Sequence, residues 1–382
     1  MRNKKLFWLV LAAVVIKIAF FLFAALHAPQ AKFQIDTEWY VDSAHGIVKY
    51  GTFAREDEGR PQLEAFRTPG YPLFLALFHV LWGIPANGII ILQILLTLLT
   101  AWITYRAATA IDPHLGFLSA VIILFDPTIT IFSLVLLTET LCLFLMSLFL
   151  WHFILYLQNK RMKRLVLSAL FLVLATYTRP ITLYLGGAVG IFIFYAWVRT
   201  KDLQKAVIHT AAFLIIVYSC LGAWQYRNSI HSGYNTFSTI TITTTDSDIG
   251  EGLYKKYSRS QHGPTPPTQS PFFYYLDAGT NSFLSLMTLP GNFKYFGSKI
   301  FTAIGKTLEY PWIVFWMIGF LAGLTKIRGD MLLQFLVLVV GYFIVASVVG
   351  SGLDVSARFR VPMMPFVAIL SSYGWMTLRK IK

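Results

Sequence analysis

Residues 134–157 read LVLLTETLCLFLMSLFLWHFILYL, a run long enough to cross a lipid bilayer as an α-helix. Its only acidic residue is Glu139, and it contains no lysine or arginine. Apolar residues follow one another without the period-two alternation that is typical of a membrane β-barrel. The run therefore predicts a transmembrane helix, and similar runs recur along most of the chain.

Ten such runs predict ten transmembrane helices. The runs are Leu6–Leu26, Gly88–Ala110, Gly116–Phe132, Leu134–Leu157, Leu165–Tyr177, Ile181–Val198, Ala206–Ala223, Pro311–Leu324, Met331–Val349 and Val361–Leu378. The composition agrees, because 56% of the 382 residues are hydrophobic, only 13% are charged, and the mean hydropathy is +0.61. We therefore expect an all-α polytopic membrane protein, a bundle of about ten transmembrane helices.

The net charge of +14 follows this topology and does not require nucleic acid as a partner. With the N-terminus in the cytoplasm, the predicted cytoplasmic segments contain sixteen basic and three acidic residues, and the rest of the chain is nearly neutral. This distribution obeys the positive-inside rule. We predict a multi-pass protein of the inner cell membrane with both termini in the cytoplasm. The sequence contains no Walker loop or dinucleotide fingerprint, which argues against an ATP-driven pump or a nicotinamide enzyme.

The predicted topology leaves two long segments on the outer side of the membrane. Residues 28–87 form a loop within an N-terminal transmembrane module, 1–224. Residues 225–310 form a second loop, rich in threonine and proline, that we expect to carry short interfacial helices before the C-terminal transmembrane helices, 311–382. Fifteen of the 18 acidic residues fall on the outer side or near the outer helix ends, so we expect any chemistry to face outward.

The first outer loop contains the residues that best fit catalysis. Residues 35–40, IDTEWY, open an amphipathic helical pattern that ends at Gly51 and suits the membrane surface. Asp36 stands at the expected N-cap, and Glu38 falls in the first turn, where a negative charge favours the helix dipole. A carboxylate held there could also act as a general base toward a hydroxyl group. The sequence leaves both interpretations open.

Other charged residues stand at the predicted outer ends of helices. Glu139 opens the fourth helix, where helix capping by Thr138 competes with a functional interpretation. Four arginines from separate outer ends could converge on one phosphate, although each could also snorkel to lipid headgroups. These arginines are Arg67, Arg179, Arg358 and Arg360.

Five short motifs occur in order along the chain. They are Asp36 with Tyr40, RTPGYPL at 67–73, LTETL at 137–141, TRP at 178–180 and RFRVP at 358–362. Together they resemble the GT-C superfamily of membrane glycosyltransferases, and more narrowly the bacterial branch related to protein O-mannosyltransferases and to the aminoarabinose transferase of lipid A. The resemblance covers most of residues 1–198 and returns in the last transmembrane helix.

The resemblance implies an inverting enzyme that passes a sugar from a polyprenyl-phosphate donor to a lipid, glycan or protein acceptor at the outer face. It implies Asp36, or Glu38 two residues later, as the base, and Glu139 matches a recurrent acidic position. The four arginines would bind the donor phosphate, and Tyr40 and Tyr71 would line the substrate site. Some members of the superfamily use a divalent cation, and the three carboxylates could hold one.

Two other classes of protein remain open. A lipid-linked oligosaccharide polymerase or ligase also has many transmembrane helices and outward arginines, but its large outer loop is expected late in the chain, without the Asp36 element. A lipid or glycan transporter is expected to place ionisable residues along a path through the bilayer. Here the interiors of the predicted helices contain almost none besides Lys17.

Overall fold

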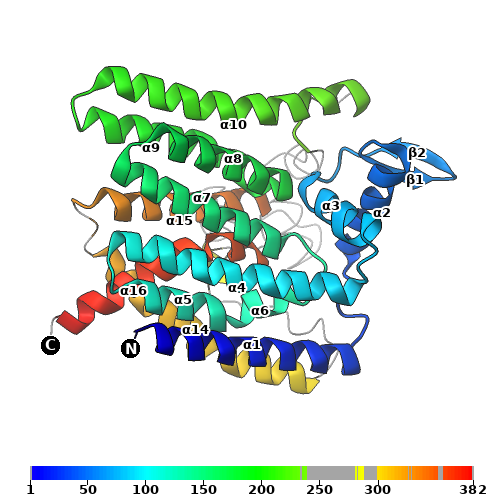
Figure 1. Ribbon diagram of the computed structural model, residues 1–382, viewed down its shortest axis with the longest axis horizontal. Coiled ribbons are helices and arrows are strands. Elements are labelled where there is room, and N and C mark those ends of the chain that lie inside the picture. Colours follow the sequence, from blue (N-terminus) through cyan, green and yellow to red (C-terminus); the bar gives the residue numbers. More distant parts are fainter. Residues whose placement is uncertain are drawn as a thin grey trace, which may run out of the picture.

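The computed structural model describes residues 2–232, 235–238, 280–281, 283–287, 299–325, 327, 329–351 and 356–380. Long helices lie side by side in one bundle, and two short helices and a β-hairpin gather at one end of it (Figure 1). We call this the α2 end, after the helix α2 (Ile35–Tyr50). The N-terminal helix begins, and the C-terminal helix ends, at the opposite end of the bundle (Figure 1).

The expected polytopic helical fold is confirmed. Within the described ranges, eight helices are long and apolar enough to cross a membrane, and a bent pair makes a ninth. The remaining predicted run, Leu165–Tyr177, corresponds to the 17-residue helix α8 (Met162–Thr178). The other helices are α1 (Arg2–His27), α4 (Ala86–Ile111), α5 (Gly116–Phe125) with α6 (Pro127–Ser133), α7 (Glu139–Asn159), α9 (Leu185–Val198), α10 (Leu203–Ser232), α14 (Lys299–Leu324), α15 (Met331–Ser351) and α16 (Met364–Lys380).

The third apolar run is bent where the sequence predicts one straight helix. α5 and α6 meet at 55°, because Asp126 ends α5 and caps α6 by accepting the backbone N–H of Ile129 at 2.9 Å. Pro127 takes the first position of α6. A backbone N–H at that position has no partner within the helix, so proline there costs no hydrogen bond. The next helix begins at Glu139 instead of Leu134.

Two helices extend past their predicted bounds toward the α2 end. α10 continues to Ser232 instead of ending at Ala223, and α14 begins at Lys299 instead of Pro311. Both boundaries of the predicted outer loop 225–310 therefore fall inside helices. Hydropathy identifies only the apolar part of a helix, so it does not predict polar helical turns at the ends of that part. The rest of that loop, with its predicted interfacial helices, lies largely outside the described residues.

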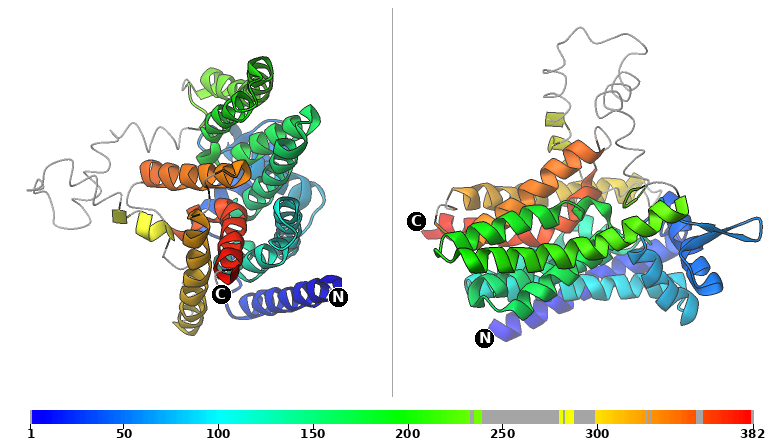
Figure 2. Two further views of the ribbon diagram at one scale, coloured as in Figure 1. Left: turned by 90° about the vertical axis from the view of Figure 1, so that its left-hand side faces the viewer. Right: turned by 90° about the horizontal axis from the view of Figure 1, so that it is seen from above.

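α7 and α16 form the centre of the bundle. About 72% of the apolar window of each is buried, against 17% for α1. α16 lies among its neighbours in Figure 2, with α1 at the periphery. α16 approaches α14 so closely that a Cβ on Gly374 would lie 1.8 Å from the carbonyl oxygen of Gly319. Small residues allow this approach of two membrane helices.

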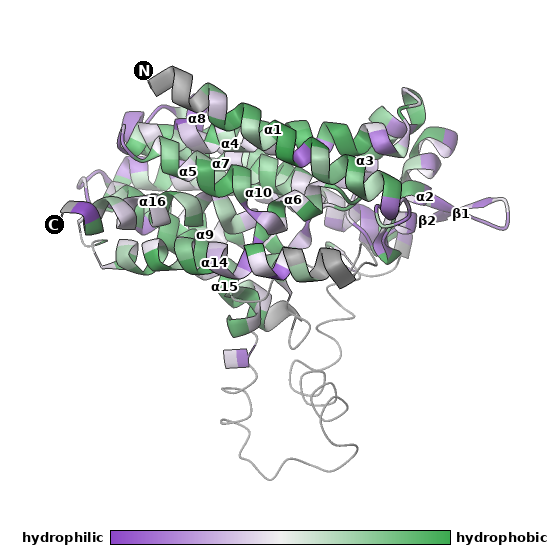
Figure 3. Ribbon diagram, turned by 90° about the horizontal axis from the view of Figure 1, so that it is seen from below, coloured by the Kyte–Doolittle hydropathy of each residue, from purple (hydrophilic) through white to green (hydrophobic). Residues whose placement is uncertain are grey.

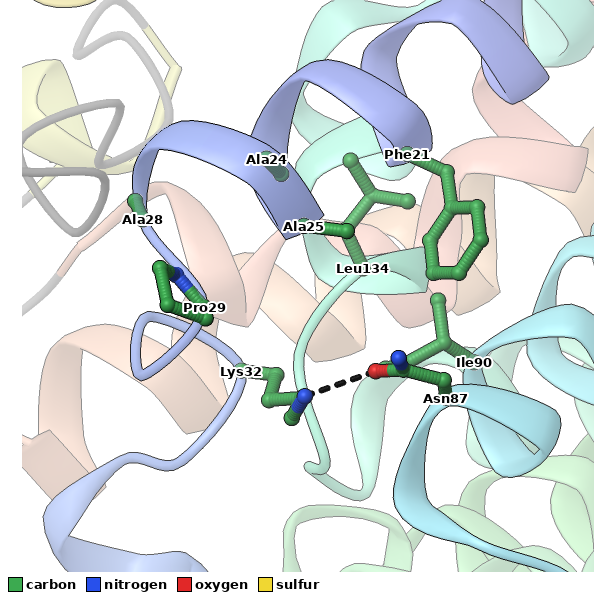
Figure 4. A pocket seen from close by; sticks show the side chains of 9 residues that line it. All are labelled: Phe21, Ala24, Ala25, Ala28, Pro29, Lys32, Asn87, Ile90 and Leu134. Atoms are coloured by element: carbon green, nitrogen blue, oxygen red, sulfur yellow. Dashed lines mark hydrogen bonds between the residues drawn. The ribbon is translucent and has the colours of Figure 1, made fainter.

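α1 is held to the bundle by a buried polar contact. The ammonium group of Lys17, which is wholly buried, donates to Thr130 Oγ1 of α6 at 2.8 Å. Near the α2 end, small side chains of α1 leave a pocket against α4, and Lys32 donates to Asn87 at 2.6 Å beside it (Figure 4). Hydrophobic residues cover the helices, while hydrophilic residues gather on the β-hairpin (Figure 3). The α2 end of the bundle therefore includes a polar region.

Candidate active site

The helix of the first outer loop forms as predicted, but its N-cap is different. α2 ends at Gly51, which adopts the left-handed conformation with φ of 66°. The N-cap is Gln34, which forms a capping box with Thr37. The prediction that Asp36 is the cap is therefore wrong. Because Thr37 completes the cap, the carboxylate of Asp36, in the first turn, is available for other partners.

Hydrogen bonds fasten the start of α2 to the segment before α7. Thr37 Oγ1 donates to the carbonyl oxygen of Leu136 at 2.9 Å. The N–H of Leu136 donates to the carbonyl oxygen of Lys32, also at 2.9 Å. These two bonds hold the elements that carry Asp36 and Glu139 side by side, although the two acids lie far apart in the sequence.

Two arginines bind the two oxygens of Asp36. Arg67 Nη2 donates to Oδ1 at 2.6 Å. Arg358 donates to Oδ2 through Nη1 at 3.3 Å and Nη2 at 3.2 Å. The side chains are 22% exposed for Asp36, 13% for Arg67 and 24% for Arg358. All three side chains are therefore partly exposed.

Glu139 extends this set of ion pairs into the bundle. Its Oε1 accepts from Arg358 Nε at 2.7 Å and forms an ion pair with Arg179 Nη1. Thr138 makes no capping bond for α7, and its hydroxyl accepts from Arg179 at 3.2 Å instead. Glu139 is wholly buried. It therefore orients two arginines and lies out of reach of a substrate proton.

We call this set of five ionised side chains the arginine network. It contains three guanidinium groups and two carboxylates, so its formal charge is +1. Its members come from α2, the segment before α3 (Gly70–Leu75), the start of α7, the end of α8, and a turn before α16. They are Asp36, Arg67, Glu139, Arg179 and Arg358.

A carboxylate that the sequence analysis missed holds Arg67 in place. Glu64, which is 3% exposed, accepts the backbone N–H groups of Phe66 at 2.5 Å and Arg67 at 3.2 Å. Its other oxygen pairs with Arg55 Nε at 2.7 Å. Arg55 belongs to the hairpin of β1 (Ala54–Asp57) and β2 (Arg60–Leu63). The signal in the sequence was weak, because binding of nearby backbone N–H groups is typical of the shorter Asp side chain and not of Glu.

Two motifs singled out from the sequence lie in direct contact. A Cβ on Gly70 would lie 2.7 Å from Thr178 Oγ1 and 2.8 Å from the backbone nitrogen of Thr178. Thr68 Oγ1 also donates to the carbonyl oxygen of Thr178 at 3.2 Å. Only glycine allows this approach. It brings together the two segments that carry Arg67 and Arg179.

Tyr40 and Tyr71, predicted to line the substrate site, lie beneath the network. Their rings meet edge to face at 5.3 Å, and they are 4% and 0% exposed. The guanidinium of Arg67 lies 5.4 Å from the ring centre of Tyr40, and the Tyr71 hydroxyl donates to Gln93 at 2.8 Å. Burial raises the pKa of Tyr40 and raises that of Tyr71 further. Both are neutral phenols, of which Tyr40 packs against Arg67 and Tyr71 packs against Tyr40.

Two of the predicted site residues lie apart from the network. Glu38 is exposed on α2. Arg360 is wholly buried and pairs with Glu309 of α14 at 2.7 Å. The sequence placed Arg358 and Arg360 together because they are two residues apart. The structure separates them because the turn directs their side chains to different partners.

The carboxylates do not fit the divalent cation that the sequence suggested. Asp36 and Glu139 direct their oxygens at arginines, and Glu38 is exposed elsewhere on α2. In the part of the chain that the structure describes, no group of three or more His, Cys, Asp or Glu side chains is arranged to hold a metal ion.

A family model matches part of the chain. Residues 66–224 match the family model of dolichyl-phosphate-mannose-protein mannosyltransferases. No curated protein matches the chain. A solved structure named ArnT from Cupriavidus metallidurans, bound to undecaprenyl phosphate, has a TM-score of 0.44 at 11% identity over 95% of this chain and 77% of its own.

The oligosaccharyltransferase of Archaeoglobus fulgidus has a similar structure. Its complex with Zn and sulfate gives a TM-score of 0.58 at 13% identity, over 98% of this chain and 49% of that one. Its complex with an inhibitory peptide and a dolichol-phosphate gives 0.56 at 12%, over 99% and 51%. The chain thus spans about half the length of this relative. The family match over residues 66–224 supports a membrane glycosyltransferase of the GT-C superfamily, and the solved structures show the shared fold.

Proposed function

We propose that the protein is an inverting glycosyltransferase that moves a sugar from a polyprenyl-phosphate donor to a lipid, glycan or protein acceptor at the outer face of the membrane. The observation that carries the proposal is the pairing of Asp36 with Arg67 and Arg358 at the α2 end. This arrangement combines a base with phosphate-binding groups at one end of a membrane bundle. The transfer requires both a base for the acceptor hydroxyl and positive groups for the donor phosphate, and this arrangement provides both.

The charge of the arginine network suits the donor. A phosphodiester that links a lipid to a sugar carries one negative charge, which matches the formal charge of +1. When the sugar leaves, the phosphate becomes a monoester with a charge nearer −2, so the arginines stabilise it more strongly as the reaction proceeds. Arg67 and Arg358 are the arginines of the network that are partly exposed, and planar guanidinium groups bind phosphate oxygens in pairs. The dolichol-phosphate in the archaeal relative supports a lipid-phosphate ligand.

The reaction is a single displacement at the sugar C1. Asp36 accepts the proton of the acceptor hydroxyl while the acceptor oxygen forms its bond to C1 from the face opposite the phosphate. The bond between C1 and the phosphate oxygen breaks, and its electron pair stays on the phosphate. The products are the inverted glycoside, a lipid phosphate and a protonated Asp36, which returns its proton to water.

Asp36 is the better base of the two first-loop acids because only Asp36 lies beside the arginines. In the free protein both of its oxygens accept from guanidinium groups. A phosphate bound by Arg67 and Arg358 competes for the same N–H groups, which frees a carboxylate oxygen for the acceptor proton. Glu139 holds Arg179 and Arg358 in place throughout.

The α2 end faces outward in this proposal, and the termini lie in the cytoplasm. The basic loops gather at the end where α1 begins and α16 ends, as the positive-inside rule expects. The donor lipid would then enter from the outer leaflet with its phosphate at the depth of the network. We propose the inner cell membrane as the location.

Transfer of a labelled sugar tests the proposed function. Purified wild-type protein is incubated with a panel of radiolabelled polyprenyl-phosphate sugars and a membrane extract of the source cells as acceptor. We expect label in the acceptor, with inverted anomeric configuration by NMR, and none with Asp36→Asn. If no donor is consumed while lipid-linked oligosaccharides are lengthened, the protein is a polymerase and the proposal is wrong.

A further inference from the structure

Arg358, Phe359 and Arg360 follow one another in the turn before α16, and each contacts a different set of residues. The turn consists of two short 3₁₀ segments, Ala357–Phe359 and Val361–Met363. Arg358 binds the two carboxylates of the arginine network. The ring of Phe359 lies 5.7 Å from the guanidinium of Arg179. Arg360 turns away from the network, into the bundle.

Arg360 binds partners from three other parts of the chain. Its Nη2 donates to Glu309 Oε1 of α14 and to Thr128 Oγ1 of α6, each at 2.7 Å. Its Nη1 donates to the carbonyl oxygen of Leu286 at 3.2 Å. Thr128 also donates to Glu309. We call Arg360, Glu309 and Thr128 the buried anchor, since each is at most 1% exposed.

A buried ion pair contributes more to geometry than to net stability. The free energy needed to remove two charges from water offsets much of their attraction, so an apolar pair of similar size is often equally stable. What the ion pair adds is direction, because the guanidinium group donates its hydrogen bonds only in its own plane. The buried anchor therefore fixes the orientation of the backbone at Arg360.

The turn has little stiffness of its own. Its backbone bonds are single 3₁₀ contacts, from Phe359 N to the carbonyl of Ser356 at 3.0 Å and from Arg360 N to that of Ala357 at 3.2 Å. Such bonds have poorer geometry than those of an α-helix. A catalytic charge must nevertheless be held to within about half an ångström. Side-chain contacts must supply that precision.

We propose that Glu309 and Arg360 are positioning residues that set where Arg358 meets Asp36 and Glu139. They act through the turn and do not touch the donor. Their effect on transfer rests on the proposed function, whereas their effect on the arginine network does not. α14 thus contributes to the site through a residue that lies outside it.

Kinetics of four variants test this inference. Glu309→Gln and Arg360→Lys break the buried anchor, and the double variant Glu309→Leu with Arg360→Met replaces it by an apolar pair. Asp202→Asn, which breaks the exposed pair with Lys205, is the matched control. We expect a rise of about tenfold or more in the donor KM for both single variants. The double variant should recover the wild-type Tm and keep the raised KM, because an apolar contact does not fix direction. Recovery of both quantities would show a purely structural role and overturn the inference.

A second measurement needs no transfer activity. The Tm is measured for Glu309→Gln, Glu139→Gln and the combination of both. Shifts from separate sites usually add, but here the two acids hold the same turn from opposite sides, so we expect a combined shift clearly different from the sum. Additive shifts would contradict the inference. If the shifts are non-additive but wild type consumes no donor, the proposed function fails and the positioning role stands.

Discussion

Asp36 and Glu139 share one guanidinium group. Arg358 donates through Nε to Glu139 and through both terminal nitrogens to Asp36. The first carboxylate is partly exposed and the second is wholly buried. The same arginine therefore connects a group that can meet a substrate with one that only maintains the arrangement. The predictions below follow from this difference.

Asp36→Asn should lower kcat for sugar transfer by about 10²- to 10⁴-fold, the usual contribution of a general base. The amide has nearly the same shape but cannot accept the acceptor proton. Initial rates with saturating donor measure the effect. Glu38→Gln and Asp42→Asn, on exposed positions of the same helix, should leave kcat within about twofold. Loss of activity in Glu38→Gln alone would move the base to that residue.

Arg358→Lys should raise the donor KM or lower kcat so that kcat/KM falls by about 10- to 100-fold, because hydrogen bonds to charged groups contribute roughly 1.5–3 kcal/mol. Lysine keeps the charge but cannot span both carboxylates with a planar fork. Arg60→Lys, at an exposed position in β2, is the control. An unchanged kcat/KM in Arg358→Lys would mean that charge alone suffices.

Glu139→Gln should destabilise the fold by about 3–5 kcal/mol, because it leaves the buried Arg179 without its carboxylate partner and Arg358 with only Asp36. Thermal unfolding in detergent measures the change. Asp202→Asn, at the surface, should leave the Tm nearly unchanged. A Tm in Glu139→Gln equal to that of wild type would show that Glu139 is not needed to neutralise Arg179 and Arg358.

Gly374→Ala should lower the free energy of unfolding by about 1–3 kcal/mol, since its methyl group would force α16 away from Gly319 of α14. Gly341→Ala, in α15, meets no atom within 4 Å and should stabilise its helix by about 0.5–1 kcal/mol. Both are measured by thermal unfolding in the same detergent. Equal shifts in the two variants would contradict the close packing of α14 on α16.

The sequence predicted which segments are helices because membrane helices depend on local hydropathy. The helix that begins near Asp36 and ends at Gly51 was also readable, since the end of a helix has local signals. Gln is a less common N-cap residue than Asp, so the sequence pattern points to Asp36, although Gln34 and Thr37 form the cap in the structure. Local sequence signals therefore explain both the correct prediction of the helix that ends at Gly51 and the wrong prediction of its N-cap.

The sequence could not predict the partners of the charged side chains. Arg358 and Arg360 look equivalent at two residues' separation, yet one binds Asp36 and the other Glu309. The choice depends on the direction in which the 3₁₀ turn presents each side chain and on helices from distant parts of the chain. Glu309 itself stands two residues before Pro311, where the predicted helix began, so it was assigned to a loop.

In the proposed reaction, the pairing of Asp36 with Arg67 and Arg358 makes donor binding an exchange of one anion for another. The phosphate gains guanidinium contacts that the carboxylate gives up, so the net free energy of binding is smaller than the strength of the new contacts. The lipid phosphate left after transfer can be displaced by the returning carboxylate in the same way. An internal competitor thus lets the protein bind a charged lipid firmly during reaction and still release it for the next turnover.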